Sequence, residues 1–218
     1  MKTITLALAA SAVALASPAA ADTLEYNAMP DAGWFFGSGN DYTPANSIVL
    51  TTDADDQLAL RLHERGVRAP ASDSMGVYSF SLGQDPVNFD WSIDNESAST
   101  ISARIYVRNL MTGQSYFYDP LGIPNDNAVS GDTAQNSFRI GGFGSPPLIG
   151  WDPNVDNTYR VDLVVDGFGG GRKQVTGFAQ MGAGAGFVPE PGTWALFILG
   201  FGAIGAAMRR GSASVSYA

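Results

Sequence analysis

The stretch TISARIYVRN at residues 100–109 decides the fold class of this chain. Every second side chain is apolar and falls on one face: Ile101, Ala103, Ile105 and Val107. The side chains between them carry polar or charged groups: Ser102, Arg104, Tyr106 and Arg108. Successive side chains of a β-strand point to opposite faces, so this alternation predicts a strand with one buried face and one solvent-exposed face.

The same alternation recurs along most of the chain. It is clear at residues 57–63, 87–93 and 159–165, and further strands are predicted at 24–29, 48–52, 76–82, 114–118, 137–140 and 174–180. Between residues 23 and 181 no segment shows convincing helical periodicity. Nine or ten short strands with one apolar face predict an all-β fold, an antiparallel β-sandwich of jelly-roll or lectin-like character, with a β-barrel as the alternative.

The connections between these strands differ in length. The sequence DGFGGG at 166–171 predicts a hairpin loop between the strands at 159–165 and 174–180. Longer loops are predicted at 33–46, 65–75, 119–136 and 141–157. Because binding residues usually lie on long loops, these four are the first places to look for a ligand site.

The composition excludes several kinds of chemistry. The chain of 218 residues has no cysteine, so it forms no disulfide and uses no thiol. Its single histidine, His63, cannot build a zinc site alone. The alternation places His63 beside Arg61 on the outward face of a strand, so we predict a surface residue rather than the base of a Ser-His-Asp arrangement. No enzymatic motif is present, although a pair of carboxylates for glycoside hydrolysis can be neither identified nor excluded.

The charge balance is strongly acidic. Three of the twelve basic residues lie at the two ends of the chain, which leaves nine elsewhere against 21 acidic residues in the whole chain. Such a surface repels nucleic-acid phosphates, so no nucleic-acid partner is expected.

The amino terminus predicts export. Lys2 is followed by an apolar run at residues 4–16 and by small residues at 19–21, which is the pattern of a signal peptide. We therefore expect residues 1–21 to be removed by signal peptidase after engagement with the export machinery. The body of the protein, residues 22–181, is then a single β-sandwich domain, followed by a flexible Gly/Ala linker at 182–187.

The carboxyl terminus predicts a membrane segment. The sequence VPEPGTWA at 188–195 leads into an uncharged run at 194–208, which two arginines end. As a single transmembrane helix this run spans about 22 Å against about 30 Å of hydrocarbon, a mismatch that Trp194 and the arginines can partly offset. The arginine pair predicts that residues 211–218 form a cytoplasmic tail.

Residues 188–210 resemble the PEP-CTERM sorting signal in its PEPxxWA form. The residues that carry the resemblance are Pro189, Glu190, Pro191, Trp194, Ala195, Arg209 and Arg210. The resemblance implies recognition by an exosortase, a membrane protease or transpeptidase, in a Gram-negative bacterium. It also implies transient anchoring in the inner membrane, followed by a place at the cell surface or outside the cell. The eight residues at 211–218 depart from the family pattern, in which such signals usually stop soon after the arginines.

The same tail motif is sometimes labelled an ice-binding protein C-terminal domain. The chain has no regular array of threonines, so that label describes the tail and not an activity of the body.

One hypothesis for the loops is a structural calcium ion. Asp152, Asn154 and Asp156 place oxygen ligands at alternate positions, as loops that bind hard cations do. Two other oxygen-rich loops lie at residues 53–56 and 125–132. The alternative is that these side chains hydrogen-bond their own turns.

A second hypothesis is sugar binding. Four aromatic residues lie in or beside predicted loops: Trp34, Tyr116, Tyr118 and Trp151. Aromatic faces stack on sugar rings, and the alternative is that these residues pack in the core or fix loops. The sequence as a whole predicts an exported, non-enzymatic protein with a structural or adhesive role in an exopolysaccharide layer. The alternative is a secreted carbohydrate-binding module or a carbohydrate-active enzyme on the same scaffold.

Overall fold

A computed structural model of the chain describes residues 21–34, 43, 45–123, 133–142, 147–168 and 171–184. The predicted sorting signal at 188–210, its membrane helix at 194–208, the tail at 211–218 and all of the predicted signal peptide but residue 21 lie outside these ranges. Within them, none of the helices has the length and apolar character needed to cross a membrane.

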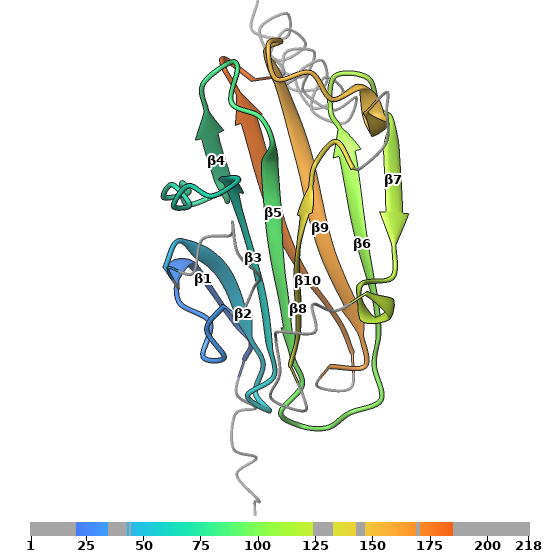
Figure 1. Cartoon of the computed structure of the whole chain (residues 1–218). Helices are drawn as coiled ribbons and strands as arrows, with labels where there is room; N and C mark the ends of the chain where they lie inside the picture. The colour runs from blue at the N-terminus through green and yellow to red at the C-terminus, as the bar shows by residue number, and fades with distance from the viewer. Residues whose placement is uncertain are drawn as a thin grey trace, which may run out of the picture.

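The described residues form two five-stranded sheets (Figure 1). The first sheet has the order β1-β2-β3-β5-β8 and contains β1 (Thr23–Ala28), β2 (Ser47–Thr51), β3 (Gln57–Glu64), β5 (Val87–Asp94) and β8 (Thr133–Arg139). The second sheet has the order β4-β10-β9-β6-β7 and contains β4 (Val77–Phe80), β10 (Arg172–Met181), β9 (Asn157–Asp166), β6 (Ser102–Asn109) and β7 (Ser115–Tyr118). Two short 3-10 helices, η1 (Pro120–Gly122) and η2 (Leu148–Gly150), lie in the connections.

The apolar faces of the two sheets enclose one core. From the first sheet it takes Leu58, Leu60, Leu62, Phe89, Trp91 and Ile93, and from the second Ile105, Val107, Val161, Leu163 and Val165. Each of these side chains is at most 1% exposed. The period-two alternation read from the sequence therefore correctly identifies the side chains that two facing sheets bury.

All ten predicted strands form, and the chain keeps two separate sheets rather than closing into one barrel. The hairpin between β9 and β10 is confirmed, since Asp166 lies opposite Arg172. One boundary is wrong: β8 begins at Thr133, inside the loop predicted at 119–136. The jelly-roll or lectin-like character of the sandwich stays a prediction.

The antiparallel prediction needs one correction. The first sheet is antiparallel throughout, but β4 pairs with β10 in parallel, with Val77 opposite Phe178. These two strands are far apart in the sequence, so no tight turn fixes their relative direction. The second sheet is therefore mixed.

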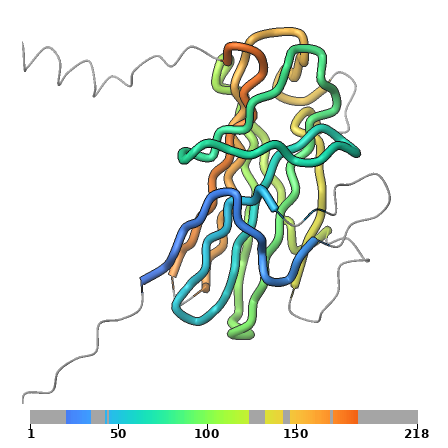
Figure 2. The backbone as a smooth tube through the Cα atoms, turned by 90° about the vertical axis from the view of Figure 1, so that its left-hand side faces the viewer, coloured from blue at the N-terminus to red at the C-terminus, as the bar shows by residue number. Residues whose placement is uncertain are grey.

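The prediction of one exposed face is wrong for β3 and β5. Their outward side chains are almost inaccessible to solvent: Arg61, His63, Asn88, Asp90 and Ser92 are at most 5% exposed. The reason is that connections cover this face. The connection from β3 to β4 crosses the body at a steep angle to the strands (Figure 2), and Asn27 on β1 donates to the carbonyl oxygen of Ser72 within it at 2.9 Å.

Candidate functional site

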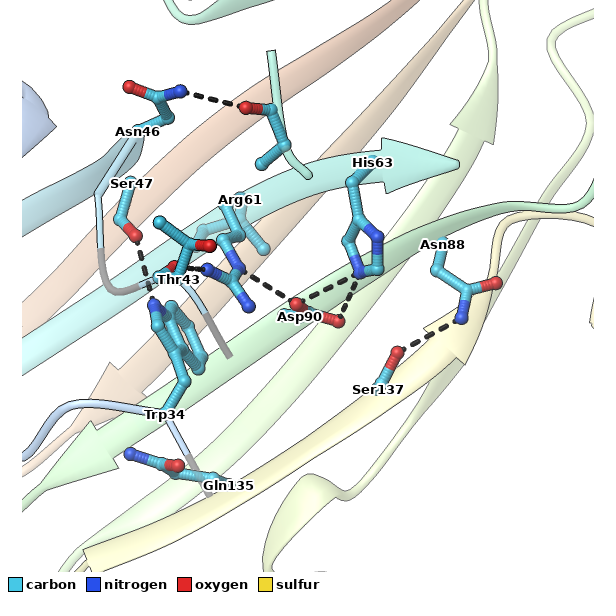
Figure 3. Close-up of polar contacts among 12 residues, drawn as sticks. Trp34, Thr43, Asn46, Ser47, Arg61, His63, Asn88, Asp90, Gln135 and Ser137 are labelled. Carbon is cyan, nitrogen blue, oxygen red and sulfur yellow. Dashed lines mark hydrogen bonds and ion pairs between the residues drawn. The ribbon is translucent and has the colours of Figure 1, made fainter. Parts of the chain in front are cut away.

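Three charged side chains are buried together on the covered face of the first sheet (Figure 3). β3 supplies Arg61 and His63, and β5 supplies Asp90. The strand register places Arg61 directly opposite Asp90, and His63 is two residues further along the same face of β3. Both cationic side chains therefore reach one carboxylate. All three side chains are 0% exposed, and we call this group the Arg61–His63–Asp90 cluster.

The carboxylate of Asp90 is shared by the two basic groups. Arg61 Nε donates to it at 2.8 Å, and His63 Nε2 lies 3.0 Å from it. The guanidinium of Arg61 also donates to the carbonyl oxygen of Thr43 and lies over the ring of Trp34, 4.6 Å from the ring centroid. The cluster thus connects the sheet to the segment that covers it.

The surroundings of His63 fix its protonation. Its Nδ1 lies 2.8 Å from the carbonyl oxygen of Glu64 and 3.1 Å from that of Val67. Carbonyl oxygens and carboxylates only accept hydrogen bonds, so both ring nitrogens carry a proton and the ring is an imidazolium.

The pKa values follow from these contacts. Burial alone lowers the pKa of His63, but the charge of Asp90, the hydrogen bond to it and the carbonyl of Glu64 outweigh burial and raise this pKa above 6.5. Burial alone raises the pKa of Asp90, but His63 and Arg61 outweigh it and lower this pKa below 3.8. Both shifts therefore favour the charged form of the group.

The prediction that His63 is a surface residue is wrong. It is held by a carboxylate, as the histidine of a Ser-His-Asp arrangement is, but both of its ring nitrogens already donate hydrogen bonds. A general base needs a ring nitrogen free to accept a proton, so this geometry gives His63 a positioning role in the fold. The sequence held one signal for the cluster: basic residues at alternate positions of one predicted strand and an aspartate at an outward position of another.

Further polar contacts fix the covering segments to the sheet. Trp34 Nε1 donates to Ser47 Oγ at 3.2 Å, and Gln135 Nε2 donates to the carbonyl oxygen of Gly33 at 2.8 Å. Asn46 Nδ2 donates to the carbonyl oxygen of Ala69 at 2.7 Å. This face is therefore an internal polar layer rather than an open binding surface.

The structure does not bring the four aromatic residues of the sugar hypothesis onto one surface. Trp34 is 4% exposed and Trp151 is 8% exposed. Trp151 donates to Asp85 Oδ1 at 2.9 Å and lines a hollow of about 120 Å³. Tyr116 and Tyr118 are half-buried and pack against the core. Sugar binding itself stays a prediction.

The predicted calcium loop makes hydrogen bonds within the protein. Asp152 Oδ1 accepts from the backbone N–H of Asn154 at 2.9 Å, and Asp156 Oδ1 accepts from that of Ala183 at 2.8 Å. In the other described loop, Asp56 accepts from Ser97. The loop at 125–132 lies outside the described ranges. No group of three or more acidic or histidine side chains close enough to hold a metal ion occurs within them. The calcium ion stays a prediction.

The outer face of the second sheet is open and carries several aromatic and basic side chains. β6 contributes Arg104, Tyr106 and Arg108, while β7 contributes Phe117 and β9 contributes Arg160 and Asp162. The register places Phe117, Tyr106 and Asp162 in one row across three strands. We call these six residues the cationic face.

Comparison with known proteins gives one match. No curated protein and no solved structure matches the chain significantly. The model of the PEP-CTERM protein-sorting motif matches residues 187–210. The match includes Pro189, Glu190, Pro191, Trp194, Ala195, Arg209 and Arg210, all of which lie outside the described ranges. The tail of this chain is therefore a PEP-CTERM protein-sorting motif, as its resemblance to that family predicts.

Proposed function

We propose that this protein is exported and sorted by an exosortase, and that its two-sheet body has a structural or adhesive role in an exopolysaccharide layer. The observation that carries the proposal is the match of residues 187–210 to the PEP-CTERM protein-sorting motif. Such a motif makes the tail a substrate of another enzyme, so Glu190 and its two neighbouring prolines are recognition positions and not catalytic residues of this chain.

The proposed route has three stages. Signal peptidase removes residues 1–21, and the apolar run at 194–208 holds the chain in the inner membrane of a Gram-negative cell with the body outside. The exosortase then cuts near Pro189-Glu190-Pro191. Proline is excluded from a helix interior, so the sequence predicts that this triplet stays out of the membrane helix, where a protease can reach it. The body then moves to the cell surface or the extracellular layer.

The test replaces the two prolines of the motif. In the parent we expect the exported product to lack the tail and to leave the membrane fraction. In the double variant Pro189→Ala/Pro191→Ala we expect the tail to be retained and the protein to stay in the membrane fraction. Intact mass and cell fractionation measure both properties.

A matched control changes another proline pair, Pro146→Ala/Pro147→Ala, which lies outside the tail. It should be processed like the parent. If the parent keeps its tail, or if the motif variant has the mass and location of the parent, the proposed sorting is wrong.

A second candidate function is that of a secreted carbohydrate-binding module. The observation that favours it is the cationic face, where an exposed aromatic ring lies beside unburied arginines on an open sheet. Sugar-binding sites combine apolar ring contacts with a few fixed polar groups, and this face offers both.

A further inference from the structure

We propose that the cationic face of the second sheet binds an acidic polysaccharide, a chain of sugars that carry carboxylates. This inference rests on the proposed function, because it names the ligand through which the body would be held in an exopolysaccharide layer.

The charge of the face is opposite to that of the protein. The chain has a net charge of −9, and only nine basic residues lie outside its two terminal signals. Four of these nine occupy outward strand positions of the second sheet: Arg104, Arg108, Arg160 and Arg172. The acidic residues at outward positions of the described strands of this sheet are Asp162 and Asp166. A positive surface on an acidic protein selects an anionic ligand.

The register places two of the arginines in direct opposition. Arg108 on β6 lies opposite Arg160 on β9, and like charges at such a position destabilise a sheet. The carboxylate of Asp162 neutralises Arg160 at 2.9 Å, and it also accepts from Gln174 at 2.9 Å and from Thr176 at 2.6 Å. Of the two opposed arginines, Asp162 therefore neutralises Arg160.

Arg104 and Arg108 keep their charges for a ligand. Both side chains are exposed, and within the described part of the chain neither makes an ion pair. They stand four residues apart on β6, about 13 Å at the rise of a strand. Two cations at this distance suit an extended chain with repeated negative charges better than a single small anion, because the chain can reach both.

The aromatic rings add the second feature of a sugar site. Phe117 is 60% exposed, and its ring centroid lies 5.9 Å from that of Tyr106. The guanidinium of Arg104 lies over the ring of Phe117, 4.9 Å from the centroid of that ring. Next to these rings is a hollow of about 210 Å³ lined by Tyr106, Arg108, Ser115, Arg160 and Asp162. An exposed ring beside a guanidinium can stack on the C–H face of a sugar while the arginine binds its carboxylate.

The protein as a whole disfavours nucleic acid on this face. A DNA duplex carries one charge per about 1.7 Å, and such a density is repelled strongly by the net charge of −9 of the protein. A polysaccharide with at most one carboxylate per sugar has a lower charge density. Its rings also present apolar faces to Phe117, which a phosphate backbone does not.

The experiment measures binding of the purified full chain, kept in detergent, to polygalacturonate, with dextran as a neutral polysaccharide and duplex DNA as a second polyanion. We expect binding to polygalacturonate that weakens as salt is added, with much weaker binding to dextran and DNA. The double variant Arg104→Ala/Arg108→Ala should bind about tenfold or more weakly, because two charge-assisted contacts are lost. Phe117→Ala should also weaken binding.

The matched control is Arg65→Ala/Arg68→Ala, which removes two exposed arginines from the connection between β3 and β4. It should bind within about twofold of the parent. Equal melting temperatures would show that all variants fold. Absence of parent binding to polygalacturonate, equal losses in the two double variants, or equal binding to DNA would each overturn the inference.

Cell fractionation separates this inference from the proposed function. The variant Arg104→Ala/Arg108→Ala keeps its sorting tail and should be processed like the parent. Loss of sorting in the variant Pro189→Ala/Pro191→Ala with unchanged polysaccharide binding would support the role of the tail in sorting and the independent role of the cationic face in binding. A parent that is sorted but does not bind polygalacturonate would leave the sorting intact and refute the inference.

Discussion

Arg61, His63 and Asp90 bring two positive charges and one negative charge into a region without solvent contact. Removing charges from water is costly, and only close contacts with the opposite charge offset that cost. Here one carboxylate serves both cations, while the carbonyl oxygen of Thr43 accepts from Arg61 and those of Glu64 and Val67 lie next to Nδ1 of His63. The stability of the covered face therefore depends on Asp90 more than on either cation.

The variant Asp90→Asn tests this dependence. It leaves two buried cations without their carboxylate, so we expect the free energy of unfolding to fall by about 3–5 kcal/mol in urea titrations. The control Asp22→Asn breaks the partly exposed ion pair with Lys173 and should cost less than about 1 kcal/mol. Equal losses in the two variants would contradict the role given to the cluster.

The pH dependence of stability should identify His63. Its pKa is raised in the folded protein, so its contribution is fully present below about 6.5, the usual value, and is lost as pH rises through the raised pKa. The pKa of Asp90 is lowered, so its contribution is present above 3.8 and is lost as pH falls through the lowered pKa. The cluster therefore stabilises the fold most between these two usual values.

Unfolding free energies of the parent measured from about pH 5 to about pH 9 should decline with rising pH, and His63→Gln should lack this decline. His63 is the single histidine of the chain, so its imidazole resonance can be followed by NMR without assignment. Titration of that resonance below 6.5 would refute the geometry described for the ring.

At the scale of elements, period two was enough to locate all ten strands, because it is a local property of the sequence. The segments that cover a strand, in contrast, come from distant parts of the sequence. The outward residues Asn88, Asp90 and Ser92 read as solvent-exposed, yet distant connections bury them. The parallel pairing of β4 with β10 was equally beyond a local pattern, since β4 joins this sheet only next to the last strand of the body.

The same contrast between local patterns and contacts of distant residues applies to the functional surfaces. The sorting motif could be predicted from the sequence because its recognition depends on an uninterrupted stretch of residues. The cationic face could not, since Arg108 and Arg160 become neighbours only through the pairing of β6 with β9. The four aromatic residues of the sugar hypothesis are half-buried or buried, whereas the exposed ring of Phe117 lies on a strand.

The contact between the two sheets depends on a glycine of β10. A Cβ at Gly177 would lie 2.7 Å from Leu62 Cδ1 and 3.2 Å from Leu60 Cδ2, both on β3 of the facing sheet. We expect Gly177→Ala to lower the free energy of unfolding by about 1–3 kcal/mol, because the added methyl overpacks the core. Gly171→Ala is the control: apart from its chain neighbours, no atom of the described residues would lie within 4 Å of a Cβ added there, so its effect in the same urea titration should stay within about 0.5 kcal/mol. A neutral Gly177→Ala would mean that the sheets can separate at this point.

At the scale of the whole molecule, charge is distributed unevenly over the two sheets. The outer face of the first sheet hides its charges under connections, and that of the second sheet displays unneutralised arginines. The net charge of −9 repels anions from the protein as a whole. The open sheet is therefore the part of the body suited to contact an anionic matrix.

The position of β10 decides how the body and the sorting tail depend on each other. β10 is the last strand of the body, but it lies inside the second sheet, between β9 and β4. It pairs with β9 over its whole length, from Arg172 to Met181, and it is the strand that holds β4 in that sheet. Processing by an exosortase must therefore cut beyond β10 if the body is to stay folded.

Two shortened chains test this separation. A chain that ends after Gly184 keeps every described strand, so it should unfold in urea with the same midpoint as the full chain. A chain that ends after Gly171 lacks β10, loses the attachment of β4 and exposes the core residues of the facing sheet, so it should show no cooperative transition. If ending the chain after Gly184 also abolished the transition, the tail would be part of the folded body. Removal of the tail by a protease would then unfold the protein instead of releasing it, and the proposed route to the cell surface would fail for a physical reason.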